Sequence, residues 1–412
     1  MVYAGHQFGG FSPQLGDGRG LLLGEVKDNK NNLIDLHMKG VGPTPYARQG
    51  DGRAVLRSSI REYLASEAMY HLGVASTRAL ALFDSEEIIY REGAEPAAML
   101  LRGACTHIRF GHFEYFFYQK KTKELDELID YCIKRHFRSM ASRTQSIIKM
   151  LEKIVESTAK MVAHWQAVGF QHGVMNTDNM SILGETLDYG PYGFMEAYDQ
   201  KWVANESDYN ARYAFEKQPA VALWNLNHLF VCFSKHLSKT QLIEILSRFE
   251  PCLINHFQAL ISAKLGLKEK HKDDLTLFSN LLVLLEKEKI DYTNFWRNLS
   301  QMQDADDKAH LILMFANRLD FEAWLASYIK RRSLEDSIWS QVRLEMLQTN
   351  PKYILRNYLA QRVIEAAENK DYRAFEALIK VLEAPFEEHE DCAHLAIPTN
   401  TEQKSFCVSC SS

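Results

Sequence analysis

The chain has 412 residues, of which 46% are hydrophobic and 25% are charged. This is the composition of an ordinary globular protein, and the length predicts two or more domains or one large two-lobed unit. The formal net charge is −5, from 48 basic and 53 acidic residues. Such a balance gives no general attraction to nucleic acid or to membrane phosphates.

No apolar run reaches the length that a bilayer requires, and the first ten residues, MVYAGHQFGG, lack the basic and apolar regions of a signal peptide. The seven cysteines are odd in number and scattered, which argues against a disulfide framework. The sequence therefore predicts a cytoplasmic protein with no membrane or nucleic-acid partner. Cys407 and Cys410 form a C-x-x-C pair near the end of the chain, which is typical of a mobile dithiol rather than of a zinc site.

The first hundred residues are rich in glycine and in short apolar runs that are typical of strands. Strands are predicted over residues 20–26, 33–39, 78–83, 86–90 and 97–102. In 33–39, side-chain alternation places Lys39 on the polar face, so that it points away from the core. Residues 54–73 carry apolar residues at helical spacing and end at Gly73, which predicts a helix with Glu62 on its polar side.

From about residue 120 the pattern becomes helical. Residues 142–169 form a long amphipathic run with a serine at its start and a glycine at its end, which predicts one long helix. Further helices are predicted over residues 218–237, 239–264, 273–288, 307–330, 336–348 and 354–382. We therefore predict an α+β fold with a small β-rich N-lobe (1–103), a large helical C-lobe (104–385) and a mobile tail (386–412).

The stretch HGVMNTDNMSILGETLDYG (172–190) gathers Asp178, Asn179 and Asp188 around one apolar run, MSIL. Magnesium prefers carboxylate and amide oxygens together with substrate phosphates. If MSIL and TLDYG paired as a hairpin, Asn179 and Asp188 would end at the same edge and bind the cation. Asp178 would then accept a proton from an attacking hydroxyl. The alternative is that the polar residues only cap a turn.

Glycines are dense over residues 5–20, before the first predicted strand, and their exposed N–H groups could hold a phosphate with the help of Arg19. The alternative is a glycine-rich hairpin. Lys39 and Glu62 have the placement of the lysine and glutamate that kinases use to orient phosphates. The alternative for these two is a pair of solvated surface charges.

Arg102 and Arg109 flank GACTHI where a predicted strand leads into the helical part. Their planar guanidinium groups match phosphate oxygens, so the two arginines could clamp a triphosphate. An inter-lobe salt bridge is the alternative.

The order of these features along the chain matches a protein kinase scaffold: glycine-rich loop, strand lysine, helix glutamate, long helix, Asp-Asn and Asp-Tyr-Gly. Two departures are visible. Asp178 and Asn179 are adjacent, whereas several residues separate the corresponding pair in kinases, and DYG stands in place of DFG.

The motifs YAGHQFG, QLGDGRG, THIRFGHFE and HGVMNTDNMSILGETLDYGP resemble the selenoprotein O family, also called YdiU. The resemblance covers most of residues 1–230 and recurs in the CVSCSS end. It implies a kinase-like fold that binds ATP in an inverted orientation. It also implies transfer of AMP to serine, threonine or tyrosine hydroxyls of protein substrates, with Mg²⁺ or Mn²⁺ and release of pyrophosphate.

The resemblance further implies roles for individual residues. Asp178 would be the base, Asn179 and Asp188 the metal ligands, and Lys39 and Glu62 the ion pair. The implied nucleotide contacts are Gly16, Gly18, Arg19, Lys39, Asp51, Gly52, Arg102, Arg109 and Asp188.

Three departures from the family accompany the match, and one is Cys410 at the position near the C-terminus where members often have selenocysteine or cysteine. Members usually carry a further N-terminal segment, so a truncated chain is expected. Some also have a cysteine where this chain has Ala204, which puts a regulatory disulfide with the tail in doubt. Other functions consistent with the residues are a true kinase, a non-catalytic nucleotide-binding scaffold and a thiol-redox protein.

Overall fold

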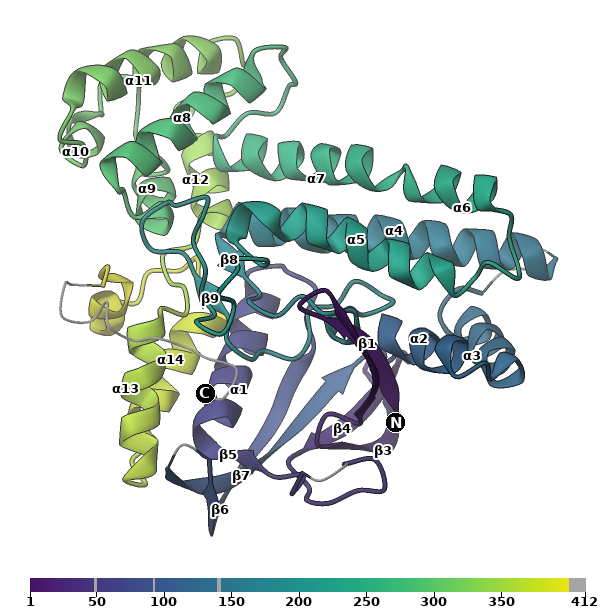
Figure 1. Cartoon of the computed structure of the whole chain (residues 1–412). Helices are drawn as coiled ribbons and strands as arrows, with labels where there is room; N and C mark the ends of the chain where they lie inside the picture. Colours follow the sequence, from purple (N-terminus) through teal and green to yellow (C-terminus); the bar gives the residue numbers. More distant parts are fainter. Residues whose placement is uncertain (48–49, 92, 139–141, 400–412) are drawn as a thin grey trace.

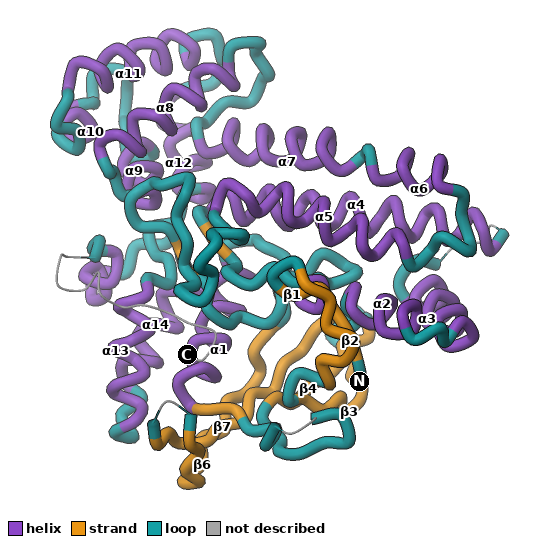
Figure 2. Tube along the Cα trace, in the orientation of Figure 1, coloured by secondary structure: helices purple, strands orange, loops and turns teal. Residues whose placement is uncertain are grey.

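The computed structural model describes residues 1–47, 50–91, 93–138 and 142–399. The molecule is a mixed α/β structure with a small region of antiparallel strands and many helices (Figures 1 and 2). The sheet lies at one end of the molecule, and the helices α8 to α11 lie at the opposite end (Figure 1). No helix among the described residues is both long and apolar enough to traverse a bilayer.

The main sheet has five strands, and all of its pairings are antiparallel. The strand order is β3-β4-β7-β5, and β6 also pairs with β7. The strands are β3 (Gly20–Lys27), β4 (Leu33–Lys39), β5 (Ala54–Val55), β6 (Arg78–Tyr90) and β7 (Ala94–Ala104). The two strands predicted over 78–83 and 86–90 are thus one strand, with an irregular register between Asp84 and Ile88.

The polar face of β4 is the inner face of the sheet. Asp35 and His37 are buried and the side chain of Lys39 is only 16% exposed, whereas Ile34 and Met38 on the other face are half-buried. The prediction that Lys39 points away from the core is therefore wrong. The alternation of polar and apolar residues predicted correctly which side chains of β4 share a face. It did not predict which face is buried, because ion pairs rather than apolar contacts bury the polar one.

The glycine-rich start of the chain forms a hairpin of β1 (Tyr3–Gln7) and β2 (Gly10–Gly16), as the alternative reading of that stretch expected. Strand β1 lies against α2 (Phe110–Tyr118) and against the short 3-10 turn Thr177–Asn179. Neither α2 nor α3 (Thr122–Arg135) was among the predicted helices, although Leu125, Ile129 and Cys132 of α3 are buried at helical spacing. The first strand of the chain thus reaches the segment that carries Asp178.

Helix α1 (Leu56–His71) lies against β6 and β7 and, on its other side, against α13 (Asn357–Glu368) and α14 (Arg373–Glu383) (Figure 1). Its apolar residues are buried at the predicted spacing: Leu56, Ile60, Leu64 and Ala68. Gly73, with φ of 81°, follows the helix end in a left-handed conformation that glycine adopts without strain. The helix prediction is confirmed.

The longest helix, α4 (Arg143–Val168), lies beside α5 (Gln218–Val231) and α7 (Phe249–Lys264). The Ser142 hydroxyl accepts a hydrogen bond from the Gln145 N–H, and Gly169 ends the helix with φ of 72°. Both helix signals in the sequence are confirmed. The strand that follows, β8 (Phe170–Gln171), pairs with β9 (Gly193–Phe194) and brackets the DNMSIL stretch.

Three predicted long helices are each broken in two. Residues 239–264 form α6 (Lys239–Leu246) and α7; residues 307–330 form α10 (Ala309–Ile312) and α11 (Arg318–Arg332); residues 354–382 form α13 and α14. Lys370 lies in the left-handed region at the last break, and no pattern of apolar spacing reports such a turn. The remaining helices are α8 (Asp274–Glu288), α9 (Tyr292–Leu299) and α12 (Trp339–Thr349).

Part of the predicted tail is packed against the helical part. Residues Glu390–Ala396 form a 3-10 turn, Leu395 is buried, and the Tyr358 hydroxyl donates to the Ile397 carbonyl at 2.9 Å. Cys407 and Cys410 lie outside the described residues.

Candidate active site

Asp188 lies between two buried arginines. The Arg102 Nη1 donates to Asp188 Oδ1 at 2.6 Å, and the Arg109 Nη1 donates to Asp188 Oδ2. Burial opposes ionisation, but the charges of Arg109 and Arg102 outweigh it and hold the pKa of Asp188 well below its usual range. The salt-bridge alternative for the two arginines is thus what this structure contains, with Asp188 as their common partner.

Arg102 also connects Asp188 to the Lys39–Glu62 pair. Glu62 is 1% exposed, and its carboxylate accepts from Lys39 Nζ and, at 2.7 Å, from Arg102 Nη1. Burial raises the pKa of Glu62, and the charges of Lys39 and Arg102 more than reverse this, so the net shift is downward. The two predicted charges are therefore not solvated: a buried network of three cations and two carboxylates joins β4, α1, β7 and the DYG segment.

Asp178 occupies the 3-10 turn Thr177–Asn179 and has few partners of its own. Its Oδ2 accepts from Gln7 Nε2 at 3.4 Å, and its Oδ1 is buried without a hydrogen-bond partner among the described residues. Its backbone carbonyl accepts from Arg109 Nη1 at 3.0 Å. Burial raises the pKa of the Asp178 carboxyl to about 7. This carboxyl group can take up and release a proton near neutral pH.

Two glycines leave the space that Asp178 fills. A Cβ atom at Gly5 would lie 2.6 Å from Asp178 Oδ1, and one at Gly111 would lie 2.2 Å from the Ala4 carbonyl oxygen and 3.2 Å from Asp178 Cα. A Cβ at Gly111 would require movement of the Ala4 backbone, and a Cβ at Gly5 would displace the Asp178 carboxyl group. Strand β1 and helix α2 therefore approach the turn as closely as glycine allows.

Hydrogen bonds of the Thr177 side chain also hold the 3-10 turn in place. Thr177 Oγ1 donates to Glu114 Oε2 at 2.6 Å and accepts from the His6 N–H at 2.7 Å. These bonds fix the orientation of the residue that precedes Asp178. Tyr3, Gln7, Glu114 and Thr177 were not predicted from the sequence, because their partners lie 63 to 171 residues away and no local pattern marks them.

Asn179 and Asp188 are not linked through a hairpin. Ser181 forms a bridge with Arg109, and Thr186 forms one with Ser76, so the predicted pairing of MSIL with TLDYG is wrong. Each stretch is held instead by a segment from earlier in the chain. Asn179 Nδ2 donates to the Val174 carbonyl at 3.0 Å, which leaves its Oδ1 as a possible metal ligand.

The predicted nucleotide contacts Gly16, Gly18 and Arg19 lie where β2 ends and in the turn that leads to β3. Gly18, with φ of 63°, packs on Tyr3, whose ring lies 4.9 Å from the Arg109 guanidinium carbon. A Cβ at Gly16 would lie 2.2 Å from the Tyr46 carbonyl oxygen. Arg19 is exposed and its Nη1 reaches the Arg53 carbonyl at 3.5 Å. These turns are connected to the Asp188 network through Tyr3.

The last two predicted residues lie in the loop before β5. Asp51 is exposed and forms a bidentate ion pair with Arg91, at 2.8 Å for both bonds. A Cβ at Gly52, with φ of 67°, would lie 1.9 Å from the Gly42 carbonyl oxygen. Among the described residues, Asp51 and Gly52 form no hydrogen bond or ion pair with the members of the Asp188 network.

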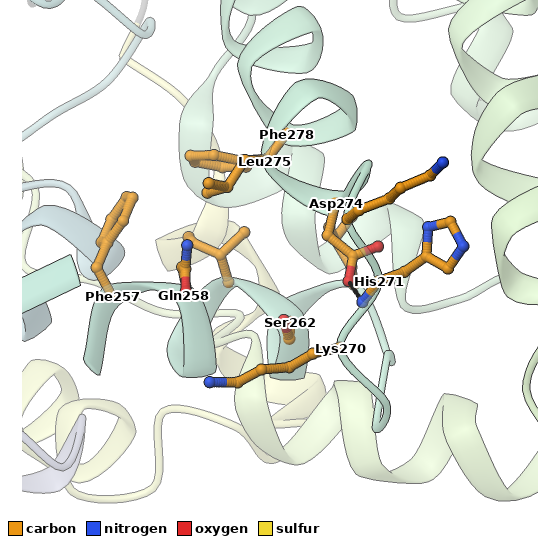
Figure 3. A pocket seen from close by; sticks show the side chains of 11 residues that line it. Phe257, Gln258, Ser262, Lys270, His271, Asp274, Leu275 and Phe278 are labelled. Atoms are coloured by element: carbon orange, nitrogen blue, oxygen red, sulfur yellow. Dashed lines mark hydrogen bonds between the residues drawn. The ribbon is translucent and has the colours of Figure 1, made fainter. Parts of the chain in front are cut away.

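A separate hollow of about 220 Å³ lies between α7 and the start of α8 (Figure 3). Its lining includes Phe257, Ser262, Lys270, His271 and Asp274. None of the predicted site residues lines this hollow. We therefore do not assign the reaction to it.

Comparison with known proteins agrees with the motif resemblance. The family model described as protein adenylyltransferase SelO matches residues 1–383. The chain is 56% identical over 412 residues to the protein nucleotidyltransferase YdiU of Marinomonas sp. strain MWYL1, covering all of this chain and 87% of that protein. Proteins of the same name from Aliivibrio salmonicida and Pectobacterium atrosepticum are each 48% identical over 412 residues, with all of this chain and 85% of each relative covered.

These matches define the class as protein nucleotidyltransferases. The chain belongs to the protein adenylyltransferase SelO family, in which its relatives carry the name YdiU.

Proposed function

We propose that the chain transfers AMP from ATP to hydroxyl groups of protein substrates and releases pyrophosphate. The observation that carries the proposal is the pairing of two different carboxyl environments within ten residues. Asp178 is buried, and one of its oxygens has no hydrogen-bond partner in the part of the chain that the structure describes, whereas Asp188 lies in a network of three cations. Family membership supports ATP as the nucleotide and a protein as the acceptor.

In the proposed reaction the acceptor hydroxyl oxygen attacks the α-phosphorus of ATP. The new O–P bond forms as the bond from the α-phosphorus to the bridging oxygen breaks, and the electron pair leaves with pyrophosphate. Asp178 accepts the proton of the hydroxyl, since its carboxyl is available as a base near neutral pH. Lys39, Arg102 and Arg109 supply positive charge for the phosphate oxygens.

Asn179 and Asp188 are the proposed ligands of a divalent cation. The donor set fits Mg²⁺ or Mn²⁺, because both residues offer oxygen and the Nδ2 bond of Asn179 leaves its Oδ1 available. Asp188 accepts one bond on each oxygen from an arginine, and a carboxylate has about four acceptor sites. A cation bound there would neutralise phosphate charge on the triphosphate.

We also propose that the molecule has the two-lobed arrangement of protein kinases, with the N-lobe over 1–103 and the C-lobe over 104–385. The small antiparallel sheet, a strand lysine in contact with a helix glutamate, and the long helix before the Asp-Asn segment support it. Inverted binding of ATP would bring the α-phosphate, rather than the γ-phosphate, to Asp178.

The test compares ATP labelled at the α-phosphate with ATP labelled at the γ-phosphate, using the full chain, Mg²⁺ or Mn²⁺ and a protein acceptor. We expect label in protein only from the α position, and loss of that label in Asp178→Asn.

Glu185→Gln is the matched control, because burial also raises the pKa of Glu185 to about 7 but its partner is the Cys105 N–H, outside the network. Label from the γ position alone would indicate a kinase. Nucleotide binding without label from either position would indicate a scaffold.

A further inference from the structure

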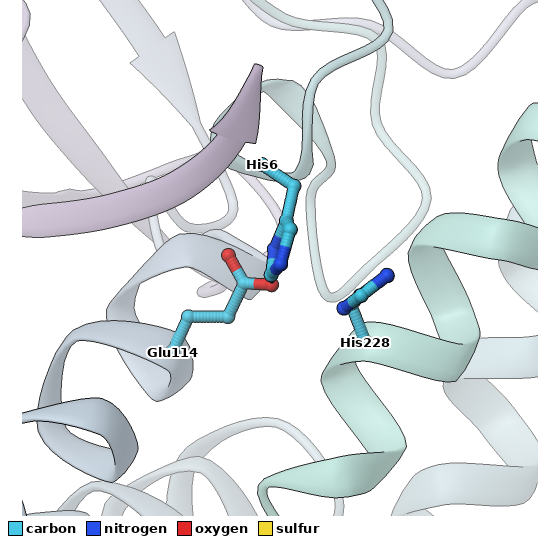
Figure 4. A group of neighbouring side chains, drawn as sticks. All are labelled: His6, Glu114 and His228. Carbon is cyan, nitrogen blue, oxygen red and sulfur yellow. The ribbon is translucent and has the colours of Figure 1, made fainter. Parts of the chain in front are cut away.

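Three side chains from distant parts of the sequence converge behind the turn that carries Asp178 (Figure 4). His6 lies in β1, Glu114 in α2 and His228 in α5. One potential ligand atom of each lies within 4.8 Å of the corresponding atoms of the other two. These atoms are close enough for small side-chain rotations to bring all three onto one small cation.

The chemistry of this group is that of a transition-metal site. Two imidazole nitrogens with one carboxylate oxygen form a ligand set that zinc uses widely, with a further position left for water or another ligand. The His6 Nδ1 lies 2.8 Å from Glu114 Oε1, and the His6 and His228 ring centroids are 3.8 Å apart. His228 Nδ1 is buried and has no hydrogen-bond partner within the described ranges, so a ligand nitrogen is left unused.

The surroundings of the group fit a metal centre as well. The second oxygen of Glu114 accepts from the Thr177 hydroxyl, as carboxylate ligands commonly do from their neighbours. The Trp224 ring lies 4.0 Å from the His228 ring and 5.4 Å from the His6 ring, and covers one side with apolar surface. The group is thus oriented by a polar contact and shielded by an aromatic one.

One other group of similar composition, Glu67, His71 and Glu383, is a weaker candidate. Arg78 binds both oxygens of Glu67, at 2.6 Å and 2.9 Å, and the Ala79 N–H donates to one of them as well. The carboxylate that would be the buried ligand therefore already accepts three hydrogen bonds, two of them from the positively charged Arg78. His71 serves as a control in the experiment below.

We propose that His6, Glu114 and His228 bind one divalent transition-metal ion of the zinc type. The ion would join β1, α2 and α5 directly behind Thr177, and so would fix the backbone that positions Asp178. It would differ from the cation of the nucleotide, since that site offers only oxygen ligands, which favour Mg²⁺. The inference is independent of the proposed AMP transfer.

The experiment uses the full chain after removal of metal with a chelator, and adds Zn²⁺ or the spectroscopic substitute Co²⁺ alone, without nucleotide. We expect one Zn²⁺ per chain by mass spectrometry of the native protein and by calorimetry. With Co²⁺ we expect visible absorption bands of a low-coordinate nitrogen and oxygen site. Added Zn²⁺ should also raise the melting temperature.

His228→Ala should weaken Zn²⁺ binding by at least about 100-fold and remove the Co²⁺ bands. This side chain forms no hydrogen bond with any residue that the structure describes, and it is only half-buried, so its loss should leave the fold intact, which circular dichroism checks. His71→Ala should retain the bands, because it alters only the other candidate group.

Absence of Zn²⁺ binding by the unsubstituted chain would overturn the proposal and reduce the group to a His6–Glu114 hydrogen bond. Bands that persist in His228→Ala, or disappear in His71→Ala, would overturn it too. If His228→Ala unfolds, His228→Gln provides the second variant, with the same expected loss.

Discussion

Asp178 and Asp188 lie in one short segment, yet their surroundings are opposite. Asp188 accepts bonds from Arg102 and Arg109, and their charges hold its pKa well below the usual range. Asp178 has one long bond from Gln7 and an unpartnered oxygen, and burial raises its pKa to about 7. The same residue type is thus kept ionised at one position and made able to exchange a proton at the other.

Neighbouring cations, rather than burial, cause the difference between the pKa values of Asp178 and Asp188. Both carboxyl groups are largely removed from water, and burial alone would raise both pKa values. Only Asp188 has two guanidinium groups bound directly to its oxygens. A pair of carboxyl groups whose pKa values are pushed apart in this way is typical of acid and base assignments in active sites.

Removal of the Asp188 carboxylate should have the largest effect. Asp188→Ala leaves Arg109, whose side chain is 1% exposed, without its carboxylate partner. We expect the free energy of unfolding to fall by about 3–5 kcal/mol. We also expect AMP transfer to fall by at least about 10³-fold. Denaturant unfolding and α-label transfer measure the two. A stable variant with intact transfer would contradict the role of the network.

Neutralisation of Asp178 should affect activity but not stability. In Asp178→Asn, we expect AMP transfer to fall by about 10²–10⁴-fold, the usual contribution of a general base. The free energy of unfolding should stay the same or rise, because the variant buries no charge at neutral pH. Paired measurements on Glu185→Gln should show unchanged transfer. An equal loss in both variants would mean that any buried carboxyl matters.

The pH dependence of stability should report Asp178 directly. Its pKa is near 3.8 in the unfolded chain and about 7 in the folded protein, so the folded state binds more protons between these values. Stability should therefore fall as pH rises from about 4 to about 7, by up to about 4 kcal/mol from this group. Denaturant midpoints in metal-free buffer with chelator measure the slope, and Asp178→Asn should lose this part of it. An unchanged slope in that variant would show that Asp178 titrates normally.

The sequence predicted much of the framework of this site. The helix with Glu62, the strand with Lys39, and the helix capped by Ser142 and Gly169 follow from local periodicity and cap residues. Local rules could not say that the polar face of β4 is the buried one. That outcome depends on Glu62 and Arg102, which reach Lys39 and His37 from other elements.

The surroundings of Asp178 could not be predicted from the sequence. Gln7, Gly5 and Gly111 meet the turn from segments far away in the chain, and nothing in their spacing reports the contact. The same holds for the candidate metal ligands, since 108 residues separate His6 from Glu114. The pairing of MSIL with TLDYG was predicted because the two stretches are close in the sequence. In the structure each stretch pairs with an earlier segment instead, through Arg109 and Ser76.

The smallest effect should come from the exposed pair of Asp51 and Arg91. Such pairs contribute about 1 kcal/mol or less, so Asp51→Ala should change the free energy of unfolding little. If Asp51 contacts the nucleotide, the KM for ATP should rise about 10-fold, as expected for one lost bond to a charged group. Asp371→Ala, which removes the exposed partner of Arg373, is the matched control and should leave KM unchanged. An unchanged KM in Asp51→Ala would remove Asp51 from the nucleotide contacts.

The close approach of Gly5 and Gly111 to Asp178 limits how this site can change during evolution. A single larger side chain at either position would collide with a backbone atom or with the carboxyl group itself. No stepwise series of slightly bulkier residues leads away from this arrangement while the turn stays in place. New acceptor preferences would therefore have to arise from outer loops, with this inner wall left as it is.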